Sequence, residues 1–104
     1  MILTNIDSMP GRRITEHYGL VAGSTVRAKN AFSDLGAALK NIIGGELRSY
    51  TQLLEESRSQ AVSRMIQQAE QLGANAILNV RFSTSNITQG ASELYVYGTA
   101  VKVE

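Results

Sequence analysis

The sequence predicts an α+β domain in which helices pack on one face of an antiparallel or mixed sheet. Apolar and polar residues alternate over residues 14–27, 76–83 and 94–103, and a period of two is typical of half-buried strands. Between the first two of these segments, residues 30–43 and 49–72 place their apolar residues at helical spacing. Helices inserted between strands in this order favour a sheet that is covered on one face.

The first expected strand carries most of its apolar residues on one face and most of its polar residues on the other. The apolar face is Ile14, Tyr18, Leu20, Ala22 and Val26, and the polar face is Arg13, Thr15, His17, Thr25 and Arg27. Gly19 and Gly23 lie within this strand. Because glycine weakens a strand, they predict a bend, a bulge or a close approach of another backbone segment.

Two helices are expected to follow. In the shorter one, Asn30 is suited to the N-cap and the glycine pair at 44–45 ends the helix. In the longer one, Ser49 and Gln52 fit a capping box, and Gly73 ends a helix of about 23 residues. Its apolar residues lie on one side, which we expect to face the sheet: Leu54, Ala61, Val62, Met65, Ile66, Ala69 and Leu72.

The last two strands are expected to be joined by a polar loop, residues 83–92. In the first of them, the residues expected to face one way are Ala76, Leu78, Val80 and Phe82. In the last strand, one face is Leu94, Val96, Gly98 and Ala100, and the other is Tyr95, Tyr97, Thr99, Val101 and Val103. This strand is therefore apolar on both faces.

The second apolar face of the last strand predicts self-association, because exposed apolar patches usually mark an interface. We assign four of its residues to contacts between copies: Tyr95, Tyr97, Val101 and Val103. On this interpretation, Val101→Lys is expected to disrupt assembly. The alternative is that residues 1–6 cover this face within the same chain. A ligand gripped by Arg81 and the two tyrosines is a further alternative, but arginine and aromatic side chains are also common at subunit interfaces.

Composition argues against several classes of function. Ten Lys and Arg against nine Asp and Glu give a net charge of +1, and the basic residues are scattered, so we expect no nucleic-acid partner. The absence of cysteine removes disulfides and thiolate metal sites. No apolar stretch approaches the roughly 20 residues that span a bilayer, and the N-terminus does not resemble a signal peptide. We therefore expect one cytoplasmic domain, residues 1–104, without a membrane partner or a cofactor.

Candidate ligand residues are few. His17 is the only histidine, and its neighbour Glu16 points to the opposite face of a strand, so the two do not chelate one ion within a flat strand. Asn30 and Asp34 could line a polar pocket, although helix capping and the helix dipole explain both residues. The sequence suggests no Ser–His–Asp triad and contains no cysteine nucleophile. We therefore predict no enzyme, no catalytic residue and no metal site, and only a weak ligand site at Glu16, His17, Asn30 and Asp34.

Five segments of the sequence carry a resemblance to a known family. They are EHYGLVAG at residues 16–23, KNAFSD at 29–34, IIGG at 42–45, GANAI at 73–77 and GTAVK at 98–102. They resemble the YbjQ family, small bacterial and archaeal proteins labelled putative heavy-metal-binding. The resemblance implies a dodecin-like subunit, with helix packed on antiparallel sheet, assembled into a pentameric ring. It implies no established activity.

Together these observations predict a non-enzymatic, ring-forming homo-oligomer that binds or scaffolds a partner at its subunit junctions. The alternative is a small-molecule or metal-ion binder in which ligands come from more than one subunit. In that alternative, His17, Glu16 and Asp34 contribute the ligands.

Overall fold

The computed structural model describes residues 1–28, 48–88 and 91–104. The described elements are strand β1 (Ile2–Leu3), strand β2 (Ile14–Ala28), helix α2 (Arg48–Leu72), strand β3 (Ala76–Thr88) and strand β4 (Ala91–Val103). The predicted α+β class is confirmed. The helix expected over residues 30–43, with its candidate residues Asn30 and Asp34, lies outside the described residues.

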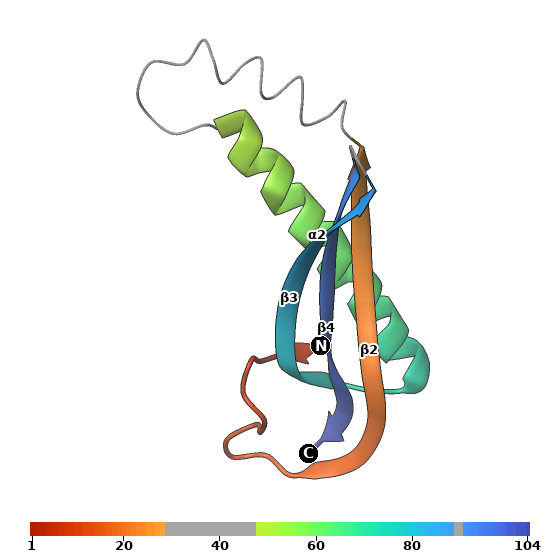
Figure 1. Ribbon diagram of the computed structural model, residues 1–104. Helices are drawn as coiled ribbons and strands as arrows, with labels where there is room; N and C mark the ends of the chain where they lie inside the picture. The colour runs from red at the N-terminus through yellow and green to blue at the C-terminus, as the bar shows by residue number, and fades with distance from the viewer. Residues whose placement is uncertain (29–47, 89–90) are drawn as a thin grey trace.

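The strands form one four-stranded sheet in the order β1-β3-β4-β2. Strands β2 and β3 both pair antiparallel with β4, whereas β1 pairs parallel with β3. The sheet is therefore mixed, the second of the two arrangements that the sequence leaves open, because the start of the chain runs beside β3 in the same direction. Figure 1 shows the three long strands side by side with α2 lying across one face, where it contacts β2 and β4.

The core lies between α2 and the sheet, as the helical periodicity predicts. Ala61, Met65 and Ala69 of α2 are fully buried and pack in one cluster with residues of the sheet, namely Val21, Ile77, Val96 and Ala100. The small alanine side chains let the helix lie close to the strands. The long helix is thus confirmed, although Leu72 at its end is 45% exposed rather than buried.

The predicted inward face of β2 is wrong beyond Gly19. The β2–β4 register shifts between His17 and Gly19, and Gly19 adopts a φ of 95°. A bulge of this kind inserts one residue into the strand, so the side chains that follow change faces. Val21 and Thr25 are consequently buried under α2, whereas two residues expected inside are exposed: Leu20 at 69% and Val26 at 54%.

A second irregularity does the same in β3. Asn79 has a φ of 54°, and the β3–β4 register shifts between Leu78 and Arg81. Ile77 and Val80 therefore lie on the α2 side, while Ala76 and Leu78 lie on the other. The prediction that Ala76, Leu78 and Val80 share a face is wrong for this reason.

The polar loop expected over residues 83–92 is largely strand. Strand β3 continues to Thr88 and β4 begins at Ala91, with Ser83 opposite Tyr95 and Ser85 opposite Glu93. Polar side chains are compatible with a strand wherever the backbone is paired and the side chains stand in solvent.

A second apolar cluster lies on the face turned away from α2, at the end of the sheet where both termini lie. It consists of Ala76, Leu78, Val101 and Val103, with Met9 packed against it. Val101 is 1% exposed and Val103 is 4% exposed. Within one chain this part of the face is therefore covered by the N-terminal segment, although at Met9 rather than by residues 1–6. Residues 2–3 pair with the β3 edge instead.

Candidate functional site

The candidate surface is the part of the sheet that faces away from α2 beyond this second cluster, here called the outer face. Its members follow from the strand register, which places Leu20 opposite Thr99, Ala22 opposite Tyr97, Ser24 opposite Tyr95, Val26 opposite Glu93 and Arg81 opposite Tyr97. Cross-strand partners share one side of a sheet. The bulge at Gly19 therefore adds Leu20 and Val26 to the tyrosines that the sequence predicts on this face.

Two tyrosine rings and exposed aliphatic side chains lie together on the outer face, with serine and other polar residues around them. The rings of Tyr95 and Tyr97 stack, with centroids 5.5 Å apart and an interplanar angle of 29°. Both tyrosines are half-buried in the single chain, while Leu20 and Val26 stand exposed beside them. Stacked aromatics with neighbouring aliphatic groups make a surface that gains from leaving water.

The Arg81 side chain is bonded to main-chain carbonyls. Its guanidinium donates to the main-chain carbonyl of Asn5 at 2.7 Å and to that of Val80 at 3.1 Å. These contacts hold the side chain against the N-terminal segment. Arg81 is therefore better explained as holding the N-terminal segment in place than as binding a flat or anionic ligand.

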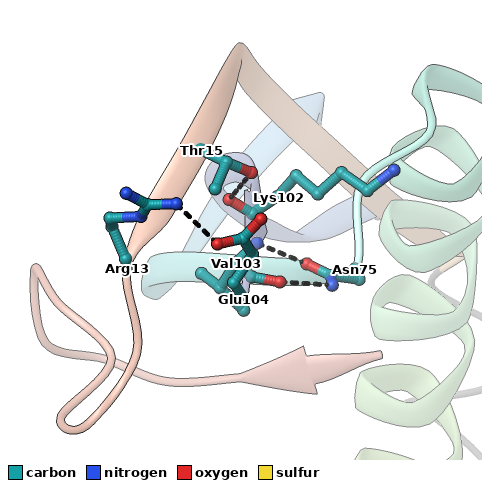
Figure 2. Close-up of polar contacts among 6 residues, drawn as sticks. All are labelled: Arg13, Thr15, Asn75, Lys102, Val103 and Glu104. Carbon is teal, nitrogen blue, oxygen red and sulfur yellow. Dashed lines mark hydrogen bonds and ion pairs between the residues drawn. The ribbon is translucent and has the colours of Figure 1, made fainter.

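A group of polar contacts holds the end of β4, as Figure 2 shows. The Asn75 amide donates to the Val103 carbonyl at 2.9 Å and accepts from the Val103 N–H at 2.8 Å. Arg13 and Glu104 form an exposed ion pair at 2.6 Å, and the Thr15 hydroxyl donates to the Lys102 carbonyl at 3.3 Å. The GANAI segment therefore supplies a side chain that imitates a pairing strand, which explains Asn75 without a ligand.

Asn75→Ala is expected to lower the free energy of unfolding by about 2 kcal/mol, because two hydrogen bonds worth about 1 kcal/mol each are lost at a half-buried position. Urea denaturation measures the change. Asn86→Ala is the matched control, since this exposed side chain bonds only to the Ser92 hydroxyl among the contacts described, and it should change stability by under about 0.5 kcal/mol. Equal effects of the two substitutions would contradict the assigned role.

The candidate ligands Glu16 and His17 do not converge. Glu16 accepts a hydrogen bond from the Tyr18 hydroxyl at 2.7 Å, and this bond, then desolvation and the carboxylate charge, raise the pKa of Tyr18. His17 is exposed and lies opposite Val101, on the other side of the strand from Tyr18. Within one chain these two side chains form no common site.

The described donors do not suit a heavy-metal ion within one chain. Soft metals prefer thiolate or thioether ligands, yet the sequence has no cysteine. Of its three methionines, Met65 is fully buried in the core, Met9 packs against the second apolar cluster, and only Met1 is exposed. In residues 1–28, 48–88 and 91–104, no three His, Cys, Asp or Glu side chains gather closely enough to hold a metal.

Within the same described residues, no helix combines the length and apolarity needed to cross a membrane.

One further surface feature escapes the sequence patterns. Thr84, Ser85, Asn86 and Ser92 line a hollow of about 260 Å³ near the β3–β4 hairpin. The Ser92 hydroxyl donates to Asn86 Oδ1 at 3.2 Å. The sequence shows a run of hydroxyl side chains in this region. It does not reveal the hollow, because only the pairing of β3 with β4 brings the residues of both strands together.

Comparison with known proteins decides the family. The model of the YbjQ family, described as putative heavy-metal-binding, matches residues 1–104. The chain belongs to the YbjQ family. A UPF0145 protein of Hahella chejuensis is 59% identical over 104 residues, covering all of both chains. A UPF0145 protein of Acinetobacter baylyi is 66% identical over 96 residues, covering 92% of this chain and 89% of the relative.

A more distant relative agrees with this assignment, and a solved structure shares the fold. A UPF0145 protein of the archaeon Archaeoglobus fulgidus is 48% identical over 103 residues, covering 99% of this chain and 95% of the relative. A crystal structure from Pediococcus pentosaceus, of a protein of unknown function in the DUF74 family, superposes with a TM-score of 0.63. It is 13% identical and covers 100% of this chain and 98% of its own, so it shows the shared fold alone.

Proposed function

We propose that this YbjQ protein works as a non-enzymatic homo-oligomer whose copies pack through the outer face of the sheet. The observation that carries the proposal is the exposure of Leu20 and Val26 beside the stacked Tyr95–Tyr97 pair. Helix α2 packs on the opposite face over β2 and β4, and in residues 1–28, 48–88 and 91–104 no helix packs on the outer face. A ring that scaffolds a partner at its subunit junctions is the arrangement we propose, with the five copies that the family resemblance implies.

The chemistry of the outer face supports a protein partner. Tyrosine is enriched at protein–protein interfaces, and charged residues are depleted at interface centres. In strand register, the centre of this face consists of Leu20, Ala22, Tyr97 and Thr99. The charged Arg81 is held to the N-terminal segment and Glu93 lies further along the strands, so the centre carries no charge.

The alternative, a ligand or metal ion held between subunits, has weaker support. The family description favours it, but each copy supplies one histidine, and within the described residues no acidic cluster accompanies it. Several copies would have to bring their His17 side chains together. His17 is exposed, so such a contact is sterically open to it. The same exposure is equally expected of a surface histidine that binds nothing.

Leu20→Glu is expected to weaken assembly at least tenfold while leaving the fold intact, because it places a charge in the centre of an apolar contact. Multi-angle light scattering after size exclusion, over a concentration series, measures the mass. Ile6→Glu is the matched control: Ile6 is 47% exposed but belongs to the N-terminal segment, so the mass should be unchanged. A single-copy mass for the wild type, or equal masses for wild type and Leu20→Glu, would overturn the proposal.

A further inference from the structure

Strand β2 lies at an edge of the sheet. It is the last strand in the order β1-β3-β4-β2 and is 15 residues long. A long edge strand offers unpaired N–H and C=O groups to another strand, and proteins commonly block such edges. In this chain the means of blocking comes from α2.

Two side chains of α2 reach the main chain of β2. The Ala22 N–H donates to Gln68 Oε1 at 2.7 Å, and Arg64 donates to the Ser24 carbonyl. Because these two backbone groups bond to α2 side chains, they point away from β4 and along the open edge. Arg64 and Gln68 are four residues apart and hence neighbours on the helix surface, matching the two-residue spacing of Ala22 and Ser24 along the strand.

The two blocked groups are complementary to each other across a two-fold axis. If a second copy of β2 ran antiparallel about Gly23, Ala22 of one copy would lie opposite Ser24 of the other. Opposed residues in a hydrogen-bonded antiparallel pair exchange N–H and C=O bonds. The same register would set Leu20 opposite Val26 of the second copy, and both side chains are exposed. The edge is therefore suited to pairing with itself.

We propose that Arg64 and Gln68 keep the β2 edge closed to a second copy of this chain. While they occupy the Ser24 carbonyl and the Ala22 N–H, the pairing about Gly23 lacks one acceptor and one donor on each copy. Copies then associate by other surfaces. The inference does not depend on the outer-face assembly proposed above, because it concerns the strand edge and predicts an added association rather than a lost one.

The test is the double substitution R64A/Q68A, with R58A/Q71A as control. The control removes the same residue types from exposed positions on the same helix. The R64A/Q68A variant is expected to form a species of twice the wild-type mass. It should do so at concentrations at least tenfold lower than the R58A/Q71A control requires. Light scattering measures the mass, and circular dichroism confirms the fold. If the double variant does not fold, Q68A alone frees the Ala22 N–H and should show the same change more weakly. Masses equal to those of the control would overturn the proposal.

Cross-linking then checks the register. The chain has no cysteine, so L20C/V26C introduces the only two thiols. In one strand these positions lie roughly 20 Å apart, too far for an internal disulfide. In the R64A/Q68A background, oxidation should join two chains quickly, and L20C alone should join them at least tenfold more slowly. Equal rates for the pair and the single cysteine would reject pairing about Gly23.

Discussion

Gly23→Ala is expected to lower the free energy of unfolding by about 3 kcal/mol, the upper end of what overpacking a core usually costs. A Cβ at this position would lie 2.0 Å from the Ala61 carbonyl oxygen and 2.6 Å from the Met65 nitrogen. Both neighbours are main-chain atoms of α2, so a rotamer change cannot relieve the overlap. The helix has to move off the strand. Urea denaturation with a helical signal measures the loss.

Gly19→Ala is the control for this substitution, because it adds the same methyl group to the same strand. Apart from its two chain neighbours, no atom of the described residues lies within 4 Å of a Cβ at Gly19, but the φ of 95° is unfavourable for an L residue. The expected cost is about 1–2 kcal/mol of backbone strain. A Gly23→Ala protein as stable as Gly19→Ala would show that α2 does not pack against β2 as closely as described.

These two glycines show where sequence reasoning stops. Their position inside a strand predicts a bend, a bulge or a close approach, and both outcomes occur. Gly19 lies at the bulge, whereas Gly23 gives α2 its close contact. The pattern could not assign one role to each, because the bulge depends on pairing with β4 and the close approach depends on the packed helix.

Elements set by local periodicity were the most predictable. Helix α2 spans Arg48–Leu72, against an expectation of residues 49–72, because a long apolar side and a terminal glycine suffice to define it. The faces of β2 and β3 were not predictable in full. A one-residue bulge reverses every later side chain, and Asn79 gives no sequence signal as clear as a glycine.

The candidate surface was predictable only in part. Tyr95 and Tyr97 were expected on the second face of β4, and their ring stacking agrees with that placement. Leu20 was expected inside, so its contribution to the outer face was missed. Val101 and Val103 were assigned to an interface, yet a residue far away in sequence, Met9, packs over their cluster. Strand alternation cannot reveal which distant segment covers a face.

Val101→Lys is therefore expected to unfold the chain rather than detach one copy from another. Val101 is 1% exposed and packs with Ala76, Leu78 and Val103 under Met9, where no opposite charge is described. An unpaired charge buried in such a cluster costs several kcal/mol, which is comparable with the whole stability of a small domain, about 5–15 kcal/mol. Loss of the far-ultraviolet circular dichroism signal at 25 °C, or a large fall in the urea midpoint, measures the effect.

Leu20→Lys separates folding from assembly. It adds the same charged side chain to the same sheet, at a position that is 69% exposed in the single chain. We expect this variant to keep the wild-type circular dichroism spectrum and to lose mass in light scattering, whereas Val101→Lys loses its structure. The opposite pattern, a folded Val101→Lys protein with single-copy mass, would mean that Met9 leaves the cluster on assembly. Val101 would then lie between copies, as the alternation of the last strand predicts.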